Sequence, residues 1–169
     1  MEESGSMVIK VQNCHKVGIV GFGKMGSAFA ERLGAGGYQV IVYDAFVDAR
    51  RAAMEHGFVV AQSLQELVQE VQVIFLLVPA GKVVDTVINE LLLYSIGNII
   101  IDAGNSYFKD SIRRALIVRE HKNFFLDCGT SGGIRGKESG FCLMVGGMRD
   151  AFDAVEEMLK VLAAVDGYG

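Results

Sequence analysis

Short apolar runs alternate with longer segments in which apolar residues recur every three or four positions. The runs are rich in valine and isoleucine, which favour strands, and the longer segments have the spacing of amphipathic helices. We expect strands at 17–20, 40–43, 58–60, 73–78, 99–101, 124–126 and 142–145. We expect helices at 25–33, 47–56, 83–93, 111–121 and 149–164, with one more helix opening at Ser63.

This alternation predicts an α/β fold of the Rossmann type, a doubly wound and mainly parallel sheet with helices on both faces. The run 73–78 is apolar on both faces of a strand, so we expect it at the buried centre of the sheet. Ser63 and Glu66 have the spacing of a capping box. We expect one domain at 16–169 after an N-terminal extension at 1–15, part of which could come from a cloning vector.

A glycine-rich loop joins the first expected strand to the first expected helix. It reads Gly21-Phe22-Gly23-Lys24-Met25-Gly26. In this pattern the first glycine permits a tight turn, the second lets the backbone approach a phosphate, and the third lets helix and strand pack closely. In a chain with 21 glycines the pattern alone could arise by chance, but its place between strand and helix predicts a pyrophosphate site. We therefore expect 16–169 to be a dinucleotide-binding domain.

An acidic residue follows the second expected strand, where Rossmann domains contact the adenosine ribose. Asp44 lies 18 residues after Gly26, and its carboxylate can accept hydrogen bonds from ribose hydroxyls. We expect Tyr43 and Asp44 to bind the cofactor. Because a carboxylate would repel a 2′-phosphate, the sequence favours NAD over NADP. The alternative is that Asp44 only caps the following helix.

Three further segments follow the carboxyl ends of expected strands, where open α/β sheets bind ligands. They are Val78-Pro79-Ala80-Gly81, Ile101-Asp102-Ala103-Gly104-Asn105-Ser106 and Gly129-Thr130-Ser131-Gly132-Gly133. Hydroxyl, amide and backbone N–H groups can hold an oxygen-rich anion. The alternative is that Asn105 and Ser106 only form a turn and a helix cap, and that 131–133 is only a flexible loop.

Together these segments resemble the N-terminal domain of the 6-phosphogluconate dehydrogenase family, especially its shorter, NAD-preferring branch. The likeness runs from about Val17 to Gly147 and includes Asp110-Ser111-x-Arg113-Arg114 and Gly140-Phe141-Cys142-Leu143-Met144-Val145-Gly146-Gly147. The related β-hydroxyacid dehydrogenases of the 3-hydroxyisobutyrate type share the glycine loop and a Ser-Gly-Gly. They usually lack the Gly-Asn-Ser and Gly-Thr-Ser-Gly-Gly forms found here.

The resemblance implies oxidation of 6-phosphogluconate by hydride transfer to nicotinamide and decarboxylation to ribulose 5-phosphate, a step of the pentose phosphate pathway. It also implies that 78–80 border the nicotinamide, that Asn105 contacts substrate and nicotinamide, and that 131–133 bind the substrate. The family's catalytic lysine and glutamate lie on helices of a second domain, beyond Gly169. We therefore expect no catalytic residue in this chain, which alone should be inactive.

The chain also departs from the family pattern at two local positions. Ala103 stands where the family commonly has the first glycine of Gly-Gly-Asn, which should leave Asn105 in place. Asp44 stands within Tyr-Asp-Ala, where the NADP-using branch has an Asn-Arg pair. A β-hydroxyacid dehydrogenase of the 3-hydroxyisobutyrate type and a standalone NAD-binding module remain alternatives.

Composition excludes several other classes of function. The net charge is −4 and no basic cluster is interleaved with aromatic residues, so we expect no nucleic-acid partner. The longest apolar run, 73–80, is far shorter than the roughly 20 residues that span a bilayer, so we expect no membrane association. Cys14, Cys128 and Cys142 lack metal-ligand spacing, which predicts no metal site and a reducing, cytoplasmic location. The expected partner is a small phosphosugar acid. By resemblance the full-length enzyme forms a homodimer, while the state of this chain stays open.

Overall fold

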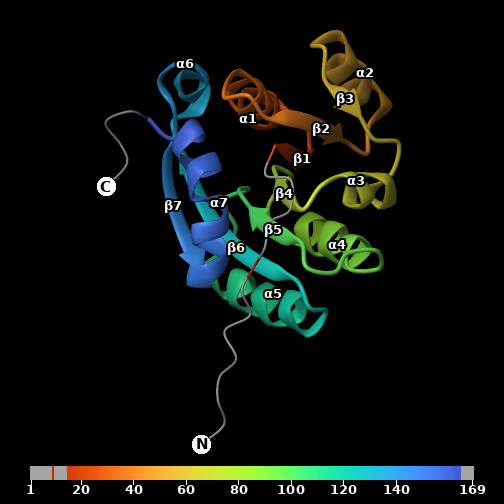
Figure 1. Cartoon of the computed structure of the whole chain (residues 1–169), viewed down its shortest axis with the longest axis vertical. Helices are drawn as coiled ribbons and strands as arrows, with labels where there is room; N and C mark the ends of the chain where they lie inside the picture. The colour runs from red at the N-terminus through yellow and green to blue at the C-terminus, as the bar shows by residue number, and fades with distance from the viewer. Residues whose placement is uncertain (1–8, 10–14, 165–169) are drawn as a thin grey trace, which may run out of the picture.

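The computed structural model describes residue 9 and residues 15–164, and it folds into one sheet with helices on both faces (Figure 1). The expected N-terminal extension therefore lies outside the described residues except at positions 9 and 15. The strands are β1 Lys16–Val20, β2 Gln39–Tyr43, β3 Val59–Val60, β4 Val73–Leu76, β5 Ile99–Asp102, β6 Phe124–Ser131 and β7 Cys142–Gly147. The helices are α1 Lys24–Ala35, α2 Val47–Glu55, α3 Leu64–Glu70, α4 Lys82–Leu91, α5 Phe108–Glu120, α6 Gly136–Ser139 and α7 Arg149–Leu162, with a 3₁₀ turn η1 at Gly133–Arg135.

The strand order confirms the expected Rossmann-type fold. The sheet runs β3-β2-β1-β4-β5-β6-β7, and every pair is parallel except β6 with β7. From the adjacent strands β1 and β4 the chain winds outward in opposite directions, so the loops after these strands diverge. A crevice at such a switch point is where open α/β sheets bind ligands.

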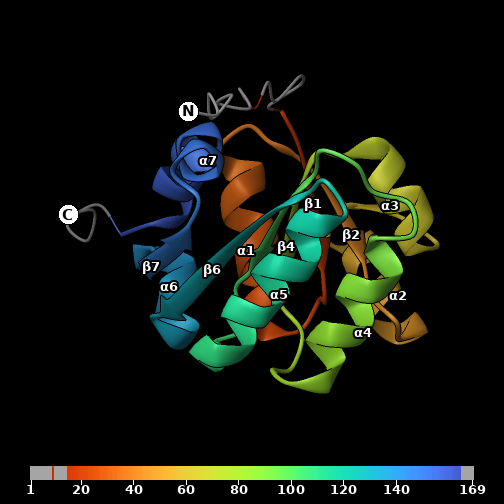
Figure 2. The same ribbon diagram turned by 90° about the horizontal axis from the view of Figure 1, so that it is seen from below.

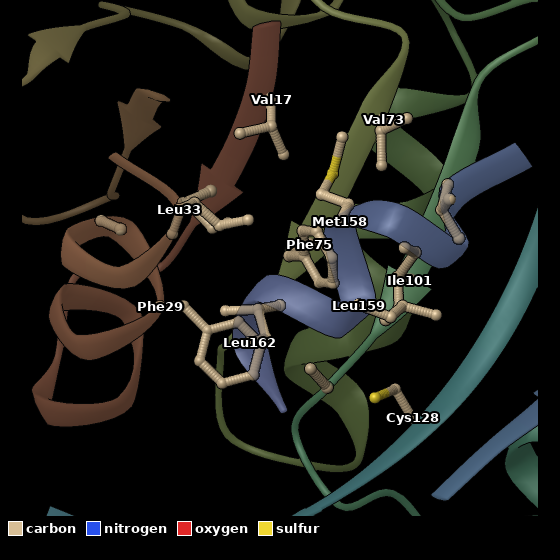
Figure 3. Close-up of a cluster of buried hydrophobic side chains, with 14 of the residues drawn as sticks. Val17, Phe29, Leu33, Val73, Phe75, Ile101, Cys128, Met158, Leu159 and Leu162 are labelled. Atoms are coloured by element: carbon tan, nitrogen blue, oxygen red, sulfur yellow. The ribbon is translucent and has the colours of Figure 1, made fainter. Parts of the chain in front are cut away.

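Two apolar clusters hold the helices on the sheet, one on each face. Helices α1, α2 and α7 cover one face, and α3, α4 and α5 cover the other (Figure 2). On the first face Phe29 of α1 and Leu162 of α7 pack towards Phe75 and Ile101 of the sheet (Figure 3). Ile100, next to Ile101 in the chain, belongs to the opposite cluster because side chains alternate along a strand.

The expected centre of the sheet is confirmed, because all four residues of β4 are fully buried. The expected capping box differs in one partner. Ser63 Oγ accepts from the Glu66 N–H at 3.1 Å, but the Glu66 carboxylate accepts from the Gln62 N–H at 2.7 Å rather than from Ser63. In the described part of the chain, no helix has both the length and the apolar character to cross a membrane.

The largest departures from the expected elements lie after residue 126. Strand β6 continues to Ser131, past the expected end at 126, because the antiparallel β7 pairs with it from Leu126 to Ser131. The glycine-rich segment after β6 forms η1 and α6, which the hydrophobic pattern did not predict. Smaller differences shift the ends of other elements by a few residues, as in α5, which begins at Phe108 instead of 111.

Candidate active site

A cavity of about 810 Å³ opens at the carboxyl ends of the parallel strands, within the size range of small-molecule sites. It gathers segments that are far apart in the sequence. The expected site residues that line it are Gly21, Phe22, Gly23, Lys24, Met25, Tyr43, Asp44, Val78, Pro79, Asn105, Ser131, Gly132 and Gly133. Gly26 and Ala80, also expected there, are not among the lining residues.

The three glycines of the loop after β1 have different surroundings. Gly21 has φ +97°, and a Cβ on it would lie 2.5 Å from the Leu77 carbonyl oxygen. A Cβ on Gly26 would collide with the Gly21 carbonyl oxygen, so the start of α1 lies directly against the loop. A Cβ on Gly23 would have no other atom within 4 Å, and no side chain caps α1 there. The first N–H groups of the helix are therefore available to an anion.

Asp44 ties the end of β2 to the glycine loop. Its Oδ2 accepts from the Phe22 N–H at 2.7 Å, and its Oδ1 accepts from the Phe46 N–H at 2.9 Å, just before α2. The Arg50 guanidinium donates to the Asp44 carbonyl oxygen at 2.6 Å and not to its carboxylate. A carboxylate can accept about four hydrogen bonds, so acceptor positions remain for a ligand hydroxyl in the cavity.

Asn105 links the segment after β5 to the end of β6. The residue has φ +57°, its Oδ1 accepts from the Thr130 N–H at 2.8 Å, and its Nδ2 donates to the Thr130 carbonyl at 3.0 Å. One lone pair and one N–H of the amide remain for a ligand. Ser131 is exposed at the end of β6, and Gly132 and Gly133 follow with φ of +138° and +50°. Contact of these residues with a substrate stays a prediction.

A buried arginine lies behind two of these segments, and sequence reasoning did not assign it a role. Only 1% of Arg114 is exposed. Its Nε donates to Asp85 Oδ1 at 2.8 Å, and its Nη2 donates to the Gly81 carbonyl at 2.9 Å. Its Nη1 donates to Asp102 Oδ2 at 3.1 Å and to Ser106 Oγ at 2.8 Å. We call these five residues the Arg114 cluster.

The two carboxylates of the Arg114 cluster differ in their surroundings. Asp102 is fully buried, and it also accepts from the Gly104 N–H at 3.1 Å and the Ser106 hydroxyl at 2.7 Å. Burial raises the pKa of Asp85, but hydrogen bonds and charge from Arg114 and Arg113 outweigh it and lower the pKa below the usual value. Asp102 thus has the partners that a buried charge requires, whereas the Asp85 side chain is 30% exposed and keeps part of its contact with water.

The sequence carried a signal for Arg114 that only the helical phase reveals. Arg114 lies three residues after Ser111 and four before Val118, and all three are the buried residues of α5. Arg113, its neighbour, is half exposed and pairs with Asp85 and Asp110. Other lining residues that we did not predict include apolar side chains of α2 and α4, namely Ala49, Val83 and Val87, and Phe46 just before α2.

Neither cysteine of the described residues lines the cavity. Burial raises the pKa of the Cys128 thiol to about 11, while Cys142 is exposed and Cys14 lies outside the described residues. Across residues 15–164 no three His, Cys, Asp or Glu side chains gather as metal ligands would.

Comparison with known proteins places these features in a family context. A family model for the NAD-binding domain of 6-phosphogluconate dehydrogenase matches residues 16–169. An NAD(+)-dependent, decarboxylating 6-phosphogluconate dehydrogenase from Haloferax volcanii is 37% identical over 159 residues, which are 91% of this chain and 52% of that protein. A decarboxylating 6-phosphogluconate dehydrogenase from Candida albicans is 37% identical over 88% of this chain and 30% of its own length. The chain thus spans about half or less of these curated relatives.

Two of the solved structures with the same architecture are dehydrogenases. A 6-phosphogluconate dehydrogenase from Plasmodium falciparum has a TM-score of 0.83 and 28% identity, covering 90% of this chain and 35% of that one. A 3-hydroxyisobutyrate dehydrogenase from Mycobacterium tuberculosis also has a TM-score of 0.83, with 26% identity, covering 88% of this chain and 52% of that one.

Proposed function

This chain belongs to the family of the NAD-binding domain of 6-phosphogluconate dehydrogenase, a family of NAD(P)-dependent oxidoreductases, and we propose that it is the cofactor half of an NAD-linked 6-phosphogluconate dehydrogenase. One observation carries the proposal. A single cavity is lined by the glycine loop, by Asp44 and by the segments of Asn105 and Ser131. A dinucleotide site and an adjoining site for an oxygen-rich acid thus lie side by side.

The residues present fit a nicotinamide dinucleotide. The open space at Gly23 and the uncapped start of α1 suit a pyrophosphate. Asp44 lines the cavity at the end of β2, where a ribose would follow the pyrophosphate, and its charge favours NAD over NADP. When bound, the nicotinamide accepts a hydride from the carbon whose hydroxyl is oxidised.

The substrate side of the cavity would orient the sugar acid. The Asn105 amide, the Ser131 hydroxyl and the backbone at Gly132 and Gly133 can donate hydrogen bonds to a carboxylate and hydroxyls. None of these four residues is a lysine, histidine or glutamate that could act as the base. We assign the base and the acid to a second domain of the full-length enzyme, which would work as a cytoplasmic homodimer without nucleic-acid or membrane partners.

Calorimetric titration of the purified 169-residue chain with NAD, NADP and 6-phosphogluconate tests the proposal. We expect NAD to bind more tightly than NADP, and the sugar acid to bind weakly without the second domain. The same preparation should show no turnover with 6-phosphogluconate and NAD. If neither dinucleotide binds, the cofactor assignment is wrong. Turnover at an ordinary enzymatic rate would show that the chain contains a base that we have not recognised.

A dehydrogenase of the 3-hydroxyisobutyrate type is the second candidate, because such an enzyme matches this fold as well as the Plasmodium enzyme does. The two functions differ in the phosphate of the substrate. Titration of the chain saturated with NADH should therefore detect 6-phosphogluconate but not 3-hydroxyisobutyrate. The reverse preference would favour the second candidate. Binding of NAD without turnover of either acid by the full-length protein would favour a standalone NAD-binding module.

A further inference from the structure

We propose that Arg114 is a positioning residue that fixes the nicotinamide end of the cavity without touching the ligand. This proposal rests on the proposed function, because it takes the cavity as the dinucleotide site. Arg114, Asp85 and Asp102 are not among the residues that line the cavity. Yet Arg114 bonds to Gly81 in the segment after β4 and to Ser106 in the segment after β5. One side chain therefore joins both segments from behind.

The shape of the guanidinium makes this joint specific. Its three nitrogens donate to different groups. Nε donates to Asp85 of α4, Nη1 to Asp102 and Ser106, and Nη2 to the carbonyl of Gly81. Gly81 has φ +93° and immediately precedes α4, so its carbonyl sets where the helix begins. A rigid planar fork can hold these groups together in one arrangement, whereas the single ammonium of a lysine cannot.

The segments held by Arg114 also contact each other and the third segment. A Cβ on Gly104 would lie 2.7 Å from the Val78 carbonyl oxygen, so no spare space separates the segments after β4 and β5. Asn105, the next residue, is bound to Thr130 through both ends of its amide. A displacement at Ser106 would therefore be transmitted to Val78 on one side and to the end of β6 on the other.

Stability alone does not account for this cluster. Taking Arg114 and Asp102 out of water carries a desolvation penalty that offsets most of their attraction, so apolar residues of similar size would hold the helix as well. What the charged groups add is direction, because each hydrogen bond has a preferred geometry. Preorganised loops bind a ligand more tightly, since less ordering is needed on binding.

Two ligands that differ at the nicotinamide end separate positioning from general support. NAD fills both ends of the site, whereas ADP fills only the glycine loop and the Asp44 end. We expect Arg114→Met to weaken NAD binding about tenfold and to leave ADP binding within about twofold of the unaltered chain. Arg113→Gln is the matched control, because Arg113 pairs with the same Asp85 at 2.9 Å but is bonded to neither segment. It should change neither affinity.

Each outcome of these titrations has a distinct meaning. Equal NAD and ADP losses in a folded Arg114→Met chain, or no loss at all, would overturn the positioning role. Ser106→Ala is the smaller change if Arg114→Met does not fold, because it removes only the hydroxyl that joins Arg114 to Asp102. It should shift the NAD-to-ADP affinity ratio in the same direction by about threefold, and an unchanged ratio refutes the role. If the unaltered chain binds neither ligand, the proposed function itself is wrong.

Discussion

Substitution of Gly26 by alanine tests how closely α1 lies against the glycine loop. The added methyl group would collide with the Gly21 carbonyl oxygen, which belongs to backbone and cannot rotate away. Overpacking of this kind destabilises by about 1–3 kcal/mol, while the better helix propensity of alanine returns up to about 1 kcal/mol. Because the methyl group meets backbone, we take a cost of about 2–3 kcal/mol, which leaves a net loss of about 1–2 kcal/mol. With about 2–4 °C per kcal/mol in a chain of this size, the Tm should fall by about 2–8 °C.

Two other glycines give the controls. Gly34, in the same helix, would place its Cβ 3.7 Å from the Phe58 ring, an ordinary contact, so Gly34→Ala should stabilise by about 0.5–1 kcal/mol through helix propensity. Gly23→Ala meets open space and extended backbone at φ −78°, so its free energy of unfolding should match that of the unaltered chain within about 0.5 kcal/mol. It should still weaken NAD binding about tenfold, because the methyl group occupies the approach of the phosphate.

Calorimetric unfolding of the three variants, followed by NAD titration of those that fold, completes the experiment. The reasoning is refuted if Gly26→Ala unfolds at or above the Tm of the unaltered chain, since the described contact then cannot exist. It is also refuted if Gly23→Ala binds NAD with unchanged affinity, since a phosphate could not then approach the loop at that glycine.

Three further predictions concern the cofactor, the thiols and the core. Asp44→Asn removes the charge that opposes a 2′-phosphate, so the NADP-to-NAD affinity ratio in calorimetry should rise about tenfold, and an unchanged ratio would end its role in specificity. At pH 8 a maleimide should label the exposed Cys142 but not the buried Cys128, because burial raises the pKa of the Cys128 thiol to about 11. Mass spectrometry of the peptides measures the labelling of each cysteine, and rapid labelling of both would contradict the burial of Cys128. Phe29→Ala should lower the free energy of unfolding by about 3–5 kcal/mol in urea, because the ring is fully buried against two others, and a loss under about 1 kcal/mol would refute that packing.

The fold could be predicted because its determinants are local or periodic. The buried run at β4 and the glycine loop between β1 and α1 each report their environment within a few residues of sequence. The length of β6 could not be predicted in the same way. The part of β6 beyond residue 126 contains Asp127 and Gly129, which disfavour strands, and the strand extends there only because β7 pairs alongside. Tertiary pairing there overrides local propensity.

The site shows the same division. Residues that bear the motifs, such as Gly23 and Asp44, were predicted to share a site, and the fold brings them to one cavity. Arg114 was noted only as part of a resemblance, because arginines on helices are mostly exposed. Its helical phase with Ser111 and Val118 distinguishes it from Arg113 once the buried face of α5 is known. The two hydrogen bonds between the Asn105 side chain and the Thr130 backbone join residues that are 25 positions apart, and no local sequence pattern indicates them.

The two edge strands of the sheet, β3 and β7, differ in length, and this difference affects how the domain avoids aggregation. At one end β3 pairs through only two residues, which gives a foreign strand little backbone to bind. At the other end β7 pairs through six residues, and its side chains Cys142 and Met144 are exposed. Intermolecular strand addition would therefore begin at β7, and charged substitutions meant to raise solubility belong on that strand rather than on β3.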